Sequence, residues 1–167
     1  MTLEEGKEQF IQSWGTLGST WGVTRTMAQI HALLLINPEP LSAEEVMEDL
    51  KISRGNANMN LRALIDWGLV HKKLKSGERK EYFVAEKDMS EVVKNIIIQR
   101  KKRELEPMLK MLEELSNIEG DNDEKVKEFK NGMEDIRLFS HKADSILVTL
   151  VGADSNWFMS TFLKMIK

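Results

Sequence analysis

Apolar side chains recur every three or four positions through most of the chain, and this spacing predicts a mainly helical protein. Residues 3–20 and 24–36 read as two successive helices, and the second has little polar surface, which predicts a central position. Pro38 and Pro40 end it, because each proline disfavours helical backbone at the residue before it. The chain therefore opens on a helical pair.

Two shorter helices follow. Ser42 and, three residues later, Glu45 match a capping box, which predicts a helix ending near Leu50. Ser53 is the expected N-cap of a further helix over 54–67, after which a glycine ends the helical pattern.

The spacing then changes. Residues 69–74 and 79–85 read as two strands, with Gly77 in the turn between them. Two short helices followed by a hairpin are the element order of a winged helix-turn-helix.

The rest of the chain returns to helical spacing. We expect a long helix over 88–116 that Pro107 kinks, a polar turn over 117–122, a helix over 123–140 and a helical C-terminal end. The fold class is therefore mainly α with a small β-hairpin. We expect N-terminal helices and a winged helix-turn-helix DNA-binding domain over 1–88, and a helical dimerisation region over 89–167.

The predicted helices of 89–167 carry more apolar surface than one small core requires, which favours a homodimer with twofold symmetry. An enlarged core in a monomer is the alternative.

Charge is concentrated in the middle of the chain. The whole chain has a net charge of −3, yet residues 51–81 hold eight basic and three acidic side chains, a local charge of +5. The remaining sixteen basic and twenty-four acidic residues give −8 elsewhere. A basic segment inside an acidic protein favours phosphate contact at one face only. A solvated charged face without a ligand is the competing interpretation.

The predicted helix over 54–67 strengthens the DNA interpretation. Its spacing turns Ala57, Leu61, Leu64 and Ile65 towards the core. Three asparagines at 56, 58 and 60 are poor helix formers, and asparagine and arginine both pair with base edges and hold phosphates. With the basic hairpin, the candidate DNA-binding residues are Ser53, Arg54, Gly55, Asn56, Asn58, Met59, Arg62, Lys72, Lys73, Lys75 and Arg79.

Other classes of chemistry find little support. The chain has no cysteine, its three histidines lie far apart, and no catalytic spacing or glycine-rich phosphate loop is present. We therefore expect no metal, no cofactor and no enzymatic activity. The acidic N-terminus and the lack of a long apolar run predict a cytoplasmic protein with no membrane partner.

Three sequence segments resemble the MarR superfamily of transcriptional regulators, and its GbsR-like branch in particular. They are Ser53-Arg54-Gly55-Asn56, Trp67-Gly68-Leu69-Val70 and Gly77-Glu78-Arg79. The resemblance implies a homodimer on pseudo-palindromic double-stranded DNA, acting as a repressor that a small-molecule effector relieves. It places Arg54, Asn56, Asn58 and Arg62 on the recognition helix and Arg79 at the tip of the wing. The branch often has a Gly-Arg pair where this chain has Ala28-Gln29.

Some relatives of that branch respond to choline, and aromatic faces attract quaternary ammonium groups. Phe10, Trp14, Trp21 and Tyr82 are the candidate effector-binding residues, although core packing is the stronger interpretation of Trp14. A winged-helix module that binds acidic protein surfaces, without specific DNA binding, is the alternative function.

Overall fold

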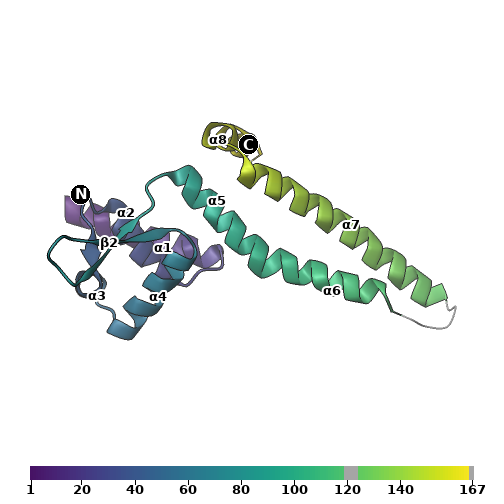
Figure 1. The fold of residues 1–167 in the computed structure, drawn as a ribbon, viewed down its shortest axis with the longest axis horizontal. Helices are drawn as coiled ribbons and strands as arrows, with labels where there is room; N and C mark the ends of the chain where they lie inside the picture. Colours follow the sequence, from purple (N-terminus) through teal and green to yellow (C-terminus); the bar gives the residue numbers. More distant parts are fainter. Residues whose placement is uncertain (119–123, 166–167) are drawn as a thin grey trace. The chain divides into compact units, whose positions relative to one another are not determined.

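The computed structural model describes residues 1–118 and 124–165 (Figure 1). The chain divides into two compact units, Met1–Val92 and Val93–Lys167. Each unit is described by itself below.

The first unit contains the four predicted helices. They are α1 (Leu3–Thr20), α2 (Arg25–Ile36), α3 (Ala43–Leu50) and α4 (Arg54–Asp66). Thr24, Ser42 and Ser53 are the N-caps of α2, α3 and α4, and each side chain accepts a hydrogen bond from a backbone N–H in the first turn. Ser42 and Glu45 form the predicted capping box. These caps explain why the helix starts were readable from the sequence.

A three-stranded antiparallel sheet completes the first unit. The strands are β1 (Leu41–Ser42), β2 (Val70–Leu74) and β3 (Glu81–Ala85), in the order β1-β3-β2. The predicted hairpin of β2 and β3 is confirmed, with Lys72 opposite Phe83. The sequence did not indicate β1, because a two-residue strand has no period of its own and forms only by pairing with β3.

The core of the first unit surrounds α2, as predicted. Ile30 and Leu34 are fully buried, and the core face of α4 packs there through Ala57, Leu61 and Leu64. Ile65 is only half-buried, although the spacing placed it on the same face.

Two glycines allow α1 to approach α2 closely. Gly18, two residues before the end of α1, is buried. A Cβ atom built on Gly18 would lie 2.4 Å from Cβ of Ala28, and one on Gly15 would lie 2.7 Å from Cγ of Gln29. The crossing of α1 over α2 therefore requires glycine at 18. The pair Ala28-Gln29, where the chain departs from the GbsR-like pattern, is part of this contact.

The expected long helix after the hairpin consists of three pieces. They are α5 (Met89–Arg100), the π-helical turn η1 (Lys101–Leu105) and α6 (Glu106–Ser116). Pro107 lies in the first turn of α6, where its missing N–H costs no α-helical hydrogen bond. The predicted break therefore occurs in η1, just before the proline. The expected turn over 117–122 lies mostly outside the described residues.

Two further helices, α7 (Glu124–Gly152) and α8 (Ser155–Met165), complete the second unit. The prediction that the penultimate helix ends at 140 is wrong by twelve residues. No glycine or proline lies between 141 and 151, so nothing in the backbone stops the helix there. Lys94 of α5 is buried and donates to the carbonyl oxygen of Ala153 over 2.7 Å, which holds the α7–α8 corner.

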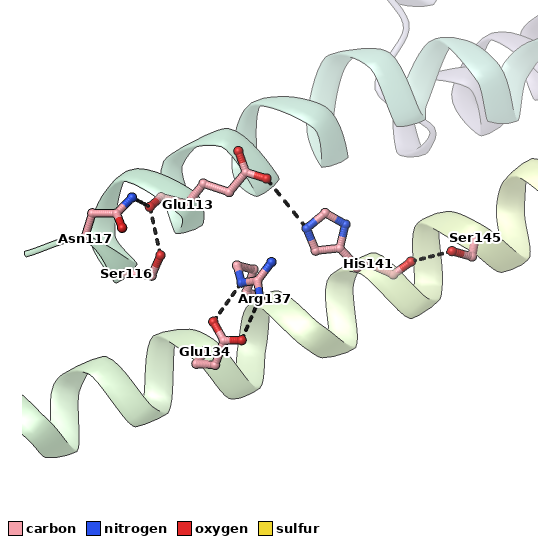
Figure 2. A network of polar contacts seen from close by, with 7 residues as sticks. All are labelled: Glu113, Ser116, Asn117, Glu134, Arg137, His141 and Ser145. Carbon is pink, nitrogen blue, oxygen red and sulfur yellow. Dashed lines mark hydrogen bonds and ion pairs between the residues drawn. The ribbon is translucent and has the colours of Figure 1, made fainter.

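Helices α6 and α7 lie side by side (Figure 1), and polar residues line their contact (Figure 2). Nε2 of His141 on α7 is 3.8 Å from Oε1 of Glu113 on α6, an electrostatic contact too long for a hydrogen bond. Arg137 forms two short hydrogen bonds with Glu134 one turn away. Leu109 and Leu112 supply the buried apolar part of α6.

Candidate nucleic-acid interface

The turn between α3 and α4 sets the position of the candidate recognition helix. Lys51 adopts the left-handed backbone conformation, with a φ of 52°, and the Ile52 N–H donates to the carbonyl oxygen of Met47. Ser53 then accepts a hydrogen bond from the Asn56 N–H over 3.3 Å. This sharp turn and cap make α3 and α4 a helix-turn-helix.

One side of α4 packs on the core and the other is free. Arg54, Gly55, Asn58 and Arg62 are exposed, and Met59 is 62% exposed. A Cβ built on Gly55 would meet no atom within 4 Å, so the backbone at the start of α4 is open to a close approach. Most of the candidate residues of α4 therefore form one accessible surface.

The third asparagine of α4 does not belong to that surface. Only Asn56 and Asn58 were predicted to bind DNA, and the third asparagine, Asn60, is 3% exposed. It lies three residues after Ala57 and four before Leu64, so helical geometry places it on the buried side. Its amide is hydrogen-bonded to Thr24 and Asn56, and Asn56 is only half-buried.

Several of the candidate cations on the hairpin already have partners within the protein. Lys72 pairs with Glu81 on the neighbouring strand at 2.8 Å. Lys75 lies 4.0 Å from the centre of the Tyr82 ring, whose hydroxyl donates to Glu78. These contacts shape the wing and reduce its free charge.

Three candidate cations have no such partner. In residues 1–118 and 124–165, no hydrogen bond or ion pair involves the side chains of Arg62, Lys73 or Arg79. All three residues are exposed, the first on α4 and the other two on the wing. They are therefore available to bind an external anion.

Glu44, in the first turn of α3, links the helix-turn-helix to the wing. Its carboxylate lies 3.1 Å from Nζ of Lys80 and 4.0 Å from the Arg54 guanidinium. The pKa of Glu44 is below its ordinary value, first because its carboxylate accepts a backbone hydrogen bond at the helix start and then because Lys80 donates to it. Glu44 is therefore ionised at neutral pH and holds Lys80 beside α3.

The four candidate effector-binding aromatics do not form one cluster. Phe10 and Trp14 are together, with ring centres 5.4 Å apart. Trp21 is exposed at the end of α1, and Tyr82 is buried on β3. In the described part of the chain, no ring contact joins either of these two to the first pair.

Trp14 is engaged with a buried histidine. Its Nε1–H donates to Nδ1 of His31 over 3.3 Å. Burial, and then the charge of Lys87, lower the pKa of His31 to about 4, so the ring is neutral at pH 7 and accepts at Nδ1. This geometry supports the packing interpretation of Trp14.

Two long-range contacts could not be predicted from the sequence. Nζ of Lys87 donates to the carbonyl oxygens of Leu34, Leu35 and Asn37 at the C-terminus of α2. Thr24 donates to Asn60 across 36 residues of chain. Neither contact has a local motif, because each joins residues that only the tertiary fold brings together.

The described residues contain no group of three or more histidine, aspartate or glutamate side chains that could hold a metal ion. None of their helices is both long enough and apolar enough to span a bilayer.

Comparisons with known proteins agree with this geometry. The chain is 26% identical over 112 residues to the HTH-type transcriptional repressor GbsR of Bacillus subtilis. The aligned region covers 67% of this chain and 62% of the repressor. It is 30% identical over 84 residues to the HTH-type transcriptional regulator MmpR5 of Mycobacterium tuberculosis. This second aligned region covers 50% of this chain and 51% of the regulator. These matches confirm the resemblance to GbsR-type proteins, and they span between half and two thirds of each relative. No family model matches the chain.

A solved structure supports the fold. A crystal structure described as that of a transcriptional regulator superposes with a TM-score of 0.58 at 20% identity, covering 83% of this chain and 95% of the other. At that identity the likeness shows the fold, which is the predicted helical protein with a small antiparallel sheet.

Proposed function

We propose that this protein is a dimeric transcriptional regulator that binds specific DNA sequences and acts as a repressor. The observation that carries the proposal is the group of three exposed cations without protein partners, Arg62, Lys73 and Arg79, on the helix-turn-helix and its wing. The names of the two relatives point to the same activity. The proposal assigns no enzymatic activity and no cofactor, and it places the protein in the cytoplasm.

The shape of the surface suits a double helix. An α-helix fits the major groove of B-form DNA, and the exposed side of α4 offers Asn58, Met59 and Arg62 within little more than one turn. An arginine at a wing tip, such as Arg79, is suited to the narrow minor groove, where negative potential is concentrated. The charge of −8 outside residues 51–81 repels DNA from the rest of the protein.

The second unit supports a twofold assembly in which residues 89–167 pair two protomers. Phe139 is 74% exposed and Ile146 is 57% exposed, and seven residues separate them along one side of α7. Large apolar side chains exposed on a helix at this spacing are typical of a surface that a partner covers. Two copies would place their recognition helices one DNA turn apart, roughly 34 Å.

Selection from a library of randomised DNA duplexes tests this function. With the full-length protein as bait, we expect enrichment of a pseudo-palindrome whose half-sites are about 10 base pairs apart, because two symmetric recognition helices read both half-sites. Enrichment of a single, unrepeated half-site would contradict the dimer. If no sequence is enriched at low salt, the protein is not a specific DNA-binding regulator, and the protein-interaction module becomes the better account.

A further inference from the structure

A row of hydrogen bonds joins the N-terminus of α2 to the exposed side of α4. The Thr24 hydroxyl donates to Oδ1 of Asn60 over 3.0 Å, and Nδ2 of Asn60 donates to Oδ1 of Asn56 over 2.7 Å. Thr24 also caps α2 by accepting the Met27 N–H. Asn60, in the middle, is buried, whereas Thr24 is exposed and Asn56 is half-buried.

One backbone carbonyl group fixes the direction of these hydrogen bonds. Nδ2 of Asn60 lies 2.9 Å from the carbonyl oxygen of Asn56, and a carbonyl oxygen only accepts hydrogen bonds. The nitrogen of the Asn60 amide must therefore face Asn56, and its oxygen must face Thr24. Because the Asn60 nitrogen donates, the side-chain atom of Asn56 that it meets must be the acceptor Oδ1.

The direction of these hydrogen bonds determines which group Asn56 presents to a ligand. Its Oδ1 is engaged within the protein, whereas no hydrogen bond within residues 1–118 or 124–165 uses its Nδ2. A free asparagine amide offers one donor group and one acceptor, the pair that matches the N6 and N7 atoms of adenine. With its oxygen turned towards Asn60, the polar group of Asn56 that has no partner among the described residues is the Nδ2 donor.

Donors distinguish two classes of base in the major groove. Guanine presents two acceptors, N7 and O6, and thymine presents the acceptor O4, whereas adenine presents one acceptor, N7, beside an amino donor, and cytosine presents an amino donor. A side chain that approaches with its donor therefore favours the keto bases, guanine and thymine. Asn58, in contrast, is exposed and has no hydrogen-bond partner among the described residues, so its amide is free to turn either way.

We propose that Asn56 reads a keto base in each half-site through its Nδ2 group, and that Asn60 is the positioning residue that holds it in this orientation. This inference rests on the proposed DNA-binding function and deepens it. It also separates Asn56 from Asn58, which were both predicted from the sequence to bind DNA, without a distinction between them.

The test compares base preferences selected from the same randomised duplex library by four full-length proteins. The wild type should favour guanine or thymine over adenine and cytosine by roughly fivefold at one position of each half-site, as expected for one hydrogen bond. N56A should lose that preference. N60L, which keeps the shape of the side chain but removes its donor, should accept adenine there as well. N58A is the matched control and should keep the keto preference at that position.

The outcomes separate the inference from the function on which it rests. If N56A selects the same bases as the wild type, or binds all sequences more weakly with an unchanged profile, Asn56 does not read a base and the inference is wrong. If circular dichroism shows that N60L is unfolded, the comparison of N56A with N58A still decides the reading role. A wild-type protein that enriches no sequence overturns both the inference and the proposed function.

Discussion

Replacing both Arg62 and Arg79 by alanine should weaken binding to the selected DNA by at least about a hundredfold. Each arginine is exposed without a protein partner, so its loss removes a contact to DNA and leaves the fold intact. Each arginine contact to a base or phosphate contributes on the order of 1–3 kcal/mol, and the proposed dimer loses four of them. Fluorescence anisotropy with a labelled duplex measures the change.

Arg137→Ala is the matched control for this experiment. It removes the same kind of charge from α7, where Arg137 pairs with Glu134 of the same helix. We expect it to bind DNA within about twofold of the wild type, because Arg137 lies outside the helix-turn-helix and the wing. If the double variant also stays within twofold, these two arginines are not part of the interface.

Gly18→Ala is expected to lower the free energy of unfolding by about 3 kcal/mol. The added Cβ would lie 2.4 Å from Cβ of Ala28 and 2.9 Å from Cγ2 of Val23, so α1 must move away from α2. Overpacking of this kind costs on the order of 1–3 kcal/mol in a well-packed core, and here the clash involves atoms close to the backbone. Urea denaturation followed by circular dichroism measures the loss.

Gly6→Ala, in the same helix, is the control for this prediction. Its Cβ would meet only Sδ of Met1, at an ordinary contact distance of 3.7 Å. Alanine favours helix over glycine by up to about 1 kcal/mol, so this variant should be as stable as the wild type or slightly more stable. Equal stability of Gly18→Ala and Gly6→Ala would show that α1 and α2 do not pack as closely as described.

Local signals in the sequence explain most of what could be predicted of the fold. The capping residues Ser42 and Ser53 fixed the starts of α3 and α4, because a cap acts within three residues of itself. Gly68, with a φ of 70°, marked the end of α4 for a similar local reason. Strand β1 was missed because it is defined by its pairing with β3. The full length of α7 was missed because nothing but the absence of a stop signal indicates it.

The candidate interface was predictable in its elements but not in its pairings. Helical periodicity placed Arg54, Asn58 and Arg62 on the exposed side of α4. It did not distinguish Arg79, which is unpaired, from Lys72, which pairs across the hairpin with Glu81. The sequence also could not indicate the contact between Asn60 and Thr24, because Thr24 lies 36 residues away at the start of another helix.

The most direct test of DNA binding as the function is the salt dependence of affinity for the selected duplex. Three unpaired cations in each of two protomers displace about six counterions, so the logarithm of the association constant should fall with the logarithm of salt concentration with a slope of about −5. Anisotropy titrations between roughly 50 and 200 mM salt measure it. A slope near zero, or no binding at the lowest salt, would contradict the proposal that this surface binds DNA.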